Sequence, residues 1–185
     1  MLILASASPR RAELLRNAGL EFRAVPPHVP EEHAPGEAPT AYVERLARAK
    51  AEAIAARFSG DTVLGADTTV VIDAAILEKP RDAADARRML RQLSGRTHHV
   101  TTGVCVAHGG AAMVEHETTL VTLDPITEDE IDRYVAVGEP MDKAGAYAIQ
   151  GIASRWASRI EGCYFNVVGL PVPRVYRILR KIGAA

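Results

Sequence analysis

The chain lacks most of the features that would place it in a specialised class. It has two cysteines in 185 residues, Cys105 and Cys163, and they have neither metal nor redox spacing, which suits small core residues of a reduced protein. Its formal net charge is −1, so any anion site must be local. No apolar run reaches membrane-spanning length, and the opening "MLILASASPRR" is too short and too soon charged for a signal peptide. We therefore expect a cytoplasmic protein with no nucleic-acid or membrane partner.

Several catalytic signatures are also missing. The sequence has no Gly-x4-Gly-Lys-Ser/Thr loop, no Gly-x-Gly-x-x-Gly turn and no Gly-x-Ser-x-Gly elbow, which argues against P-loop, Rossmann and serine-hydrolase chemistry. The six histidines lack zinc-ligand spacing, and the adjacent His98 and His99 point to opposite faces of their predicted strand. The remaining composition, 48% hydrophobic and 24% charged, is that of an ordinary globular protein.

The pattern of apolar residues and turn signals predicts a mixed α/β protein. Helices are expected over residues 8–18, 40–58, 83–93, 127–137 and 172–183, and strands over 2–6, 21–25, 62–73, 75–80, 97–108 and 112–123. Gly109-Gly110 predicts a hairpin, Thr127 to Glu130 a capping box, and residues 138–162 a loop-rich region. We expect a single α/β domain over 1–185, with a twisted, partly antiparallel sheet, flanking helices and two lobes around a cleft.

Two arginines occupy an unusual place at the first predicted helix. Ser8-Pro9 opens this helix as a cap and first position should, but Arg10 and Arg11 follow where the helix dipole favours acidic residues. Exposed arginines are tolerated at a helix end. Alternatively, the two guanidinium groups, the Ser6 and Ser8 hydroxyls and the free backbone N–H groups form a phosphate cradle. In that case loss of either arginine should leave the empty protein equally stable or more stable.

Two further charges interrupt apolar patterns. Lys50 lies seven residues after Val43, within the apolar stripe of the second long helix, either with its stem packed and its head in water or with its head facing an anion in a cleft. Asp67 lies in the apolar run "VLGADTTVV", where it either ends the strand or is buried with a cation or metal partner. Glu78-Lys79-Pro80, taken alone, indicates only a loop.

Together these residues form an inventory suited to a polyphosphate. Two carboxylates, Asp67 and a loop glutamate, accompany four cations at positions 10, 11, 50 and 79. Cations can hold phosphate oxygens, and carboxylates can hold a divalent ion or an attacking water. Hydrolysis of a phosphoanhydride is the reaction class that these residues favour.

Five stretches of the chain resemble, in order, the signatures of a known family. They are "LASASPRRAELL", "YVERLARAKA", "LGADTTVV", "LEKPRDAADARRMLRQLSGRTH" and "GEPMDKAGAYAIQG". The resemblance is to the Maf family of nucleoside-triphosphate pyrophosphatases. It implies a mixed α/β fold similar to that of the inosine-triphosphate pyrophosphatases, and cleavage between the α- and β-phosphates with Mg²⁺ or Mn²⁺. Since the family is often dimeric, a homodimer is compatible with it.

The resemblance also implies roles for individual positions. Asp67 matches the proton acceptor for the attacking water, and Asp67 with the loop acid Glu31 would hold the metal. The phosphate-binding positions are Ser6, Arg10, Arg11, Lys50 and Lys79.

Substrate choice within the family is carried by three marker positions, Arg10, Thr68 and Gln150. Arg-Arg and "GAYAIQG" resemble the dTTP/UTP branch rather than the 7-methyl-GTP branch. A glutamine amide can match the O4 acceptor and N3–H donor of uracil and thymine, although a flipped amide also suits cytosine. The alternatives are a 7-methyl-GTP pyrophosphatase, housekeeping removal of modified pyrimidine nucleotides, or a nucleotide-binding regulator of septum formation.

Overall fold

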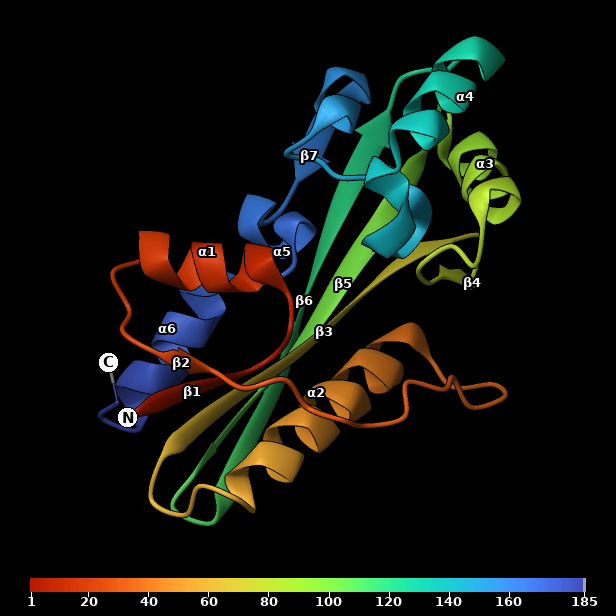
Figure 1. Cartoon of the computed structure of the whole chain (residues 1–185). Helices are drawn as coiled ribbons and strands as arrows, with labels where there is room; N and C mark the ends of the chain where they lie inside the picture. The colour runs from red at the N-terminus through yellow and green to blue at the C-terminus, as the bar shows by residue number, and fades with distance from the viewer. Residues whose placement is uncertain (185) are drawn as a thin grey trace. The chain divides into compact units, whose positions relative to one another are not determined.

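The chain forms a seven-stranded mixed sheet with flanking helices, seen in a computed structural model that describes residues 1–184 (Figure 1). The strand order is β2-β1-β3-β5-β6-β7, with β4 paired to β3. β1 runs parallel to β2 and β3, whereas β4 is antiparallel to β3 and β7 to β6. The strands are β1 (Leu2–Ala5), β2 (Arg23–Ala24), β3 (Thr62–Ile72), β4 (Ala75–Leu77), β5 (Thr97–His108), β6 (Ala111–Leu123) and β7 (Ala157–Glu161). The predicted mixed sheet is confirmed.

The helices begin and end mostly where their capping signals indicate. Ser8 caps the first helix, and Thr127 with Glu130 forms the predicted capping box of the fourth. The helices are α1 (Pro9–Asn17), α2 (Pro39–Ala55), α3 (Ala83–Leu93), α4 (Glu128–Val137), α5 (Tyr164–Val168) and α6 (Val172–Lys181). Among residues 1–184, none of the helices combines the length and apolar character that a bilayer crossing requires.

Two sequence expectations need correction. α2 begins at Pro39 rather than Thr40, because proline suits the first helical position, and it ends at Ala55, before Phe58. The region 138–162, expected to be loop-rich, contains ordered short elements: the 3₁₀ helices η1 (Glu139–Asp142), η2 (Ala144–Ala146) and η3 (Ile152–Trp156), and strand β7. Contacts from other parts of the chain hold these elements, so local sequence patterns do not reveal them.

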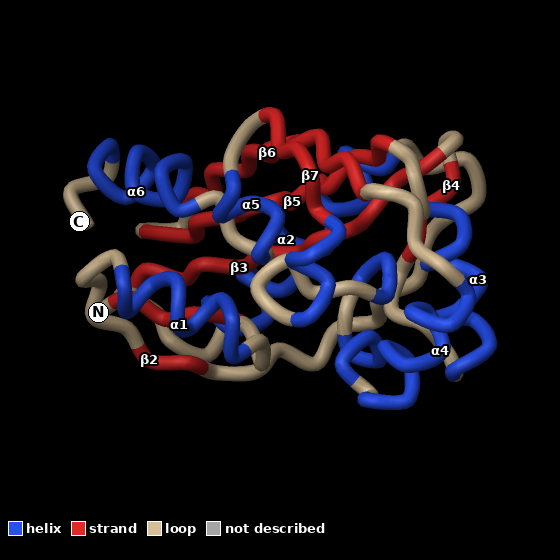
Figure 2. Tube along the Cα trace, turned by 90° about the horizontal axis from the view of Figure 1, so that it is seen from above, coloured by secondary structure: helices blue, strands red, loops and turns tan. Residues whose placement is uncertain are grey.

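The chain divides into two compact units. Unit 1 comprises 1–68, 102–117 and the described chain from 169 onward, and unit 2 comprises 69–101 and 118–168. In unit 2, α3 lies beside α4 (Figure 2), and Tyr134 packs edge-on against Trp156. In unit 1, a cluster rich in small buried side chains lies between α2 and the sheet: Ile3, Ala5, Ala47, Ala51, Ile54, Val63, Cys105 and Ala107.

Two glycines let α2 lie directly against the sheet in unit 1. A Cβ on Gly65 of β3 would collide with the backbone oxygen of Ala47, and a Cβ on Gly103 of β5 would collide with that of Val43. Neither position has an unusual backbone angle, so close approach rather than flexibility requires glycine there. Lys50 belongs to the same buried side of α2 as Ala47 and Ala51, so this placement of the helix brings Lys50 against the sheet.

Candidate functional site

Asp67 lies within β3 rather than at its end. The strand continues to Ile72, so the interpretation of Asp67 as a strand terminator is wrong. Residues two apart in a strand share a face, which places Asp67 on the same face as Gly65, toward α2. Its side chain is buried, and its Oδ1 accepts a hydrogen bond from Lys50 Nζ at 2.6 Å. The carboxylate is therefore buried as part of an ion pair, which offsets the cost of removing it from water.

Lys50 does not extend into water. Only 5% of the residue is exposed, and its Nζ lies 2.6 Å from Asp67 Oδ1 and 2.7 Å from Glu31 Oε1. The anions that face this lysine thus belong to the chain itself. Glu31 comes from the segment between β2 and α2 and is exposed, so the cluster of Asp67, Lys50 and Glu31 extends from the interior to solvent. Two carboxylates and one ammonium leave the cluster with a net charge of about −1.

Arg11 is held by neutral acceptors of unit 1. Its guanidinium donates through Nε to the Gly169 carbonyl at 2.8 Å, and through Nη1 to the Ala66 carbonyl at 2.9 Å. It also donates to Thr68 Oγ1 at 2.9 Å and to Ser6 Oγ at 3.3 Å. Desolvation by burial lowers the pKa of Arg11 from its usual value, while Asp67 acts in the opposite direction. These four bonds reverse the stability expectation for Arg11, since its removal would leave buried acceptors unpaired.

The hydroxyl groups near the start of α1 are also engaged within the protein. Ser6 Oγ accepts from the backbone N–H of Ser8, and Ser8 Oγ accepts from that of Arg11 as the helix cap. The first turn of α1 contains no acidic residue. The charged side chains that the helix itself places near the positive end of its dipole are therefore Arg10 and Arg11. Two cations thus lie at the positive end of the α1 dipole, and Asp67 is close enough to act on Arg11 there.

Thr68 connects the arginine to the strand that carries Asp67. Its hydroxyl accepts from Arg11 Nη2, lies 2.9 Å from Thr102 Oγ1 and donates to the Gly169 carbonyl at 3.3 Å. Gly169 has φ +129°, a conformation that favours glycine, and its carbonyl serves both Arg11 and Thr68. Sequence reasoning missed Gly169 and Gly65, because neither has side-chain chemistry to mark it.

The remaining predicted residues belong to unit 2. Lys79 is exposed just after β4, and the carbonyl of its neighbour Glu78 accepts from the backbone N–H of Gly145 at 3.2 Å. Gln150 is exposed in the turn between η2 and η3. Unit 1 therefore assembles the six predicted residues Ser6, Arg11, Glu31, Lys50, Asp67 and Thr68, with Arg10 on the same helical turn as Arg11, and unit 2 carries Lys79 and Gln150.

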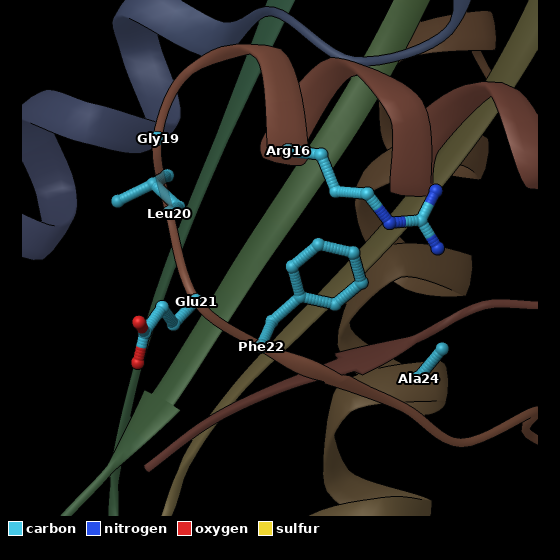
Figure 3. Close-up of a pocket in the computed structure, with 6 residues that line it drawn as sticks. All are labelled: Arg16, Gly19, Leu20, Glu21, Phe22 and Ala24. Carbon is cyan, nitrogen blue, oxygen red and sulfur yellow. The ribbon is translucent and has the colours of Figure 1, made fainter.

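A separate cavity of about 460 Å³ lies in unit 1, where α1 ends and the chain continues to β2 (Figure 3). Arg16 lies over the Phe22 ring, with its guanidinium carbon 5.7 Å from the ring centroid, and the cavity walls include Leu20 and Glu21. None of the predicted site residues lines this cavity, so it gives no support to a substrate site.

Known proteins resemble this chain over nearly its whole length. The model of the family described as "Maf-like protein" matches residues 1–182. A dTTP/UTP pyrophosphatase of Koribacter versatilis is 62% identical over 182 residues, which cover 98% of this chain and 94% of that protein. Proteins of the same name from Symbiobacterium thermophilum and Vibrio cholerae are each 50% identical, covering 98% and 97% of this chain and 94% and 97% of theirs.

The matched range 1–182 extends through both units and contains the positions of all the predicted site residues. The resemblance stated from the five sequence stretches is confirmed, and the chain belongs to the Maf family.

Proposed function

We propose that this protein hydrolyses dTTP and UTP between the α- and β-phosphates, releasing the nucleoside monophosphate and pyrophosphate. Relatives that are 50–62% identical over nearly the full chain are named dTTP/UTP pyrophosphatase. The observation that carries the proposal for this chain is the buried Asp67, which is paired with Lys50 at 2.6 Å. A fold that buries an ion pair in a strand otherwise made of apolar and small residues has placed costly groups there, which is a pattern typical of functional sites.

In this proposal Asp67 takes the proton of the attacking water. A carboxylate that is rigidly held by a strand and a cation can orient a water for in-line attack at phosphorus. Lys50 holds Asp67 in position, and its ammonium is close enough to the carboxylates to interact with a phosphate oxygen entering beside them. Charge develops on the bridging and terminal phosphate oxygens as the bond breaks, and fixed cations stabilise that charge.

A divalent cation, Mg²⁺ or Mn²⁺, belongs to the same proposal. The donor set fits such an ion: Asp67 Oδ1 and Glu31 Oε1 both contact Lys50 Nζ, so the two carboxylates are close neighbours, and Mg²⁺ is commonly held by one or two carboxylates plus substrate phosphates and water. Within residues 1–184 no cluster of three or more His, Cys, Asp or Glu side chains could hold a metal without substrate. When bound, the ion would neutralise phosphate charge and polarise the scissile phosphorus.

Phosphate binding is assigned to Ser6, Arg10, Arg11 and Lys79 together with Lys50. Arg11 already donates to neutral carbonyl and hydroxyl oxygens, and a phosphate oxygen is a stronger, charged acceptor that can take over one of its N–H groups. Arg10, Thr68 and Gln150 are assigned to substrate selection, with the exposed amide of Gln150 matching the O4 and N3–H of the base.

Further expectations accompany this assignment and stay predictions: one domain over 1–185, two lobes around a cleft, a cytoplasmic location and a homodimer.

The test is release of pyrophosphate from the common nucleoside triphosphates and 7-methyl-GTP, each with Mg²⁺, with Mn²⁺ and with chelator. The proposal expects dTTP and UTP to give the highest kcat/KM, monophosphate and pyrophosphate in equal amounts, and loss of turnover on chelation. Preference for 7-methyl-GTP would move the chain to the other branch. Tight nucleotide binding without turnover would favour a regulator of septum formation.

A further inference from the structure

Gln150 lies at the centre of a short segment whose two ends meet at one carboxylate. The backbone N–H of Ile152 donates to Glu139 Oε1 at 3.1 Å and to Oε2 at 3.3 Å. The backbone N–H of Ala148 donates to the hydroxyl of Tyr134 at 3.1 Å, and that hydroxyl donates to Glu139 Oε1 at 2.8 Å. Glu139 therefore holds the segment 148–152 directly at one end and through Tyr134 at the other.

The residue before Ile152 is shaped to the same carboxylate. A Cβ on Gly151 would collide with both carboxylate oxygens of Glu139. The φ of Gly151 is −104°, so the backbone conformation does not demand glycine, and a larger residue would have to displace the Glu139 carboxylate. The backbone N–H of Gly151 donates to the Ala148 carbonyl at 3.0 Å and closes the turn that carries Gln150. The turn and the Glu139 carboxylate thus fit each other without intervening space.

The direction of the hydrogen bonds requires an acceptor at position 139. Burial, and after it the hydrogen bond with Glu139, raises the pKa of Tyr134. Its hydroxyl therefore stays protonated and donates a hydrogen bond to Glu139. Two groups thus reach the carboxylate, and both are donors: the backbone N–H of Ile152, which contacts both oxygens, and the hydroxyl of Tyr134. A carboxylate accepts at both oxygens, and a glutamine amide keeps one of these acceptors, its carbonyl oxygen.

We propose that Glu139 is the positioning residue for the base-reading amide of Gln150, holding the 148–152 turn so that selection among nucleotides is fixed before the substrate arrives. This inference rests on the proposed function and deepens it. Gln150 is exposed, and its side chain makes none of the hydrogen bonds found among residues 1–184, so only the backbone of its turn fixes where the amide lies. A segment of five residues held at both ends by one side chain loses its placement when that side chain is removed.

The experiment compares kcat/KM for UTP and for ATP in the full-length protein with Mg²⁺. The ratio of the two values does not depend on the fraction of active enzyme, so a merely destabilising change leaves it constant. Glu139→Ala is expected to lower the UTP/ATP ratio roughly 5- to 30-fold, the effect of one or two lost hydrogen bonds to a buried or charged group. Glu139→Gln keeps an acceptor at the Oε1 position and is expected to stay within about threefold of wild type.

Two further variants separate positioning from general damage. Tyr134→Phe keeps the ring that packs on Trp156 but breaks the link to Ala148, and it is expected to lower the ratio by less than Glu139→Ala does. Glu128→Ala is the matched control, because Glu128 lies in unit 2 and forms an exposed pair with Arg91. Its ratio should equal that of wild type.

A double-mutant comparison tests whether Glu139 acts through Gln150. In a Gln150→Ala background, Glu139→Ala should change UTP and ATP turnover by the same factor, because no amide remains to be positioned. Hydrogen exchange gives a readout independent of activity: the amides of Ala148 and Ile152 should exchange about tenfold faster or more in Glu139→Ala, and no faster in Glu128→Ala.

The outcomes distinguish this inference from the proposed function. If the wild type prefers UTP and Glu139→Ala keeps the full preference, the inference is overturned and the function stands. If Glu139→Ala lowers the ratio equally in the wild-type and Gln150→Ala backgrounds, Glu139 does not act through Gln150 and the inference is again overturned. A wild type with no pyrimidine preference overturns the function and, with it, the selective role of Glu139.

Discussion

The two units hold their candidate residues in opposite ways. In unit 1, the charged side chains of Lys50 and Arg11 are paired within the protein: Lys50 lies between Asp67 and Glu31, and Arg11 donates to the backbone carbonyls of Ala66 and Gly169. In unit 2, the side chain of Gln150 is exposed, and hydrogen bonds are made instead by the backbone N–H groups of Ala148 and Ile152 on either side of it. The difference suggests a division of labour. In the proposed mechanism, the groups assigned to bond breaking are fixed as side chains, whereas the group assigned to base recognition is placed by its turn and keeps its amide available.

The largest expected effect comes from breaking the unit 1 cluster at Asp67. Asp67→Asn keeps the size of the side chain and an oxygen for Lys50, but the amide cannot accept the proton of a water. We expect kcat to fall roughly 10²- to 10⁴-fold, with a folded protein by circular dichroism. Asp61→Asn is the control, because Asp61 pairs at the surface with the N-terminal amine. A folded Asp67→Asn enzyme with near-normal turnover would remove Asp67 from the mechanism.

Unit 2 should be the more sensitive unit in mild acid. Burial, with a smaller contribution from His99, lowers the pKa of His98 to about 4, and its Nε2 lies 2.8 Å from the Tyr147 hydroxyl. The folded-state pKa is below the unfolded value of about 6.5, so protonation favours the unfolded state. The stability from neutral His98 is complete above pH 6.5 and is lost as the pH falls toward 4, about 3 kcal/mol in all.

Chemical denaturation at pH 7, 6, 5 and 4.5 measures this loss. His98→Gln should be less stable than wild type at pH 7 and should show a shallower decline toward pH 4.5. His99→Gln, at the exposed neighbouring position of β5, should keep most of the wild-type slope, because His99 makes only the smaller contribution. An unchanged slope in His98→Gln would mean that carboxylates elsewhere cause the acid sensitivity.

Arg11 tests whether unit 1 is fixed before the substrate arrives. Arg11→Ala removes four hydrogen bonds, including those to the carbonyls of Ala66 and Gly169, so we expect a loss of roughly 1.5–3 kcal/mol of unfolding free energy. Arg10→Ala, at the neighbouring position, should cost less, because its charge opposes the helix dipole. Urea titration of the substrate-free protein compares the two. An Arg11→Ala protein as stable as wild type would show that the arginine is held for its ligand alone.

The smallest expected effect is a change in nucleotide selectivity in unit 2. Gln150→Ala should lower kcat/KM for UTP and dTTP about 5- to 150-fold and that for ATP by less, because only the pyrimidines use the amide. Steady-state kinetics on the three nucleotides measures the difference. Equal loss on all three would mean that Gln150 positions the triphosphate, and the base assignment would then rest on family resemblance alone.

Sequence reasoning was most successful where the signal is local. α3 and β5 have the predicted bounds, because Asp82 caps the helix and a stretch rich in valine and threonine forms the strand. Asp67 could be singled out as an interruption, but the choice between strand end and buried ion pair depended on Lys50, which is 17 residues away. The order within 138–162 depended on Glu139 and Tyr134 binding backbone groups up to fourteen residues away, which no local pattern records.

The close contact between α2 and the sheet links the ion pair of Lys50 and Asp67 to two positions that carry no side chain. At Gly65 and Gly103 the backbone of α2 fills the volume that any side chain would need. The distance between α2 and the sheet therefore depends on glycine at both positions. At this position of α2, Lys50 Nζ lies 2.6 Å from Asp67 Oδ1. A Gly65→Ala substitution would place a Cβ against the backbone of Ala47 and Ala51. We expect it to push α2 away from β3, to lengthen the contact between Lys50 and Asp67 and so to lower activity, although position 65 has no part in the proposed chemistry.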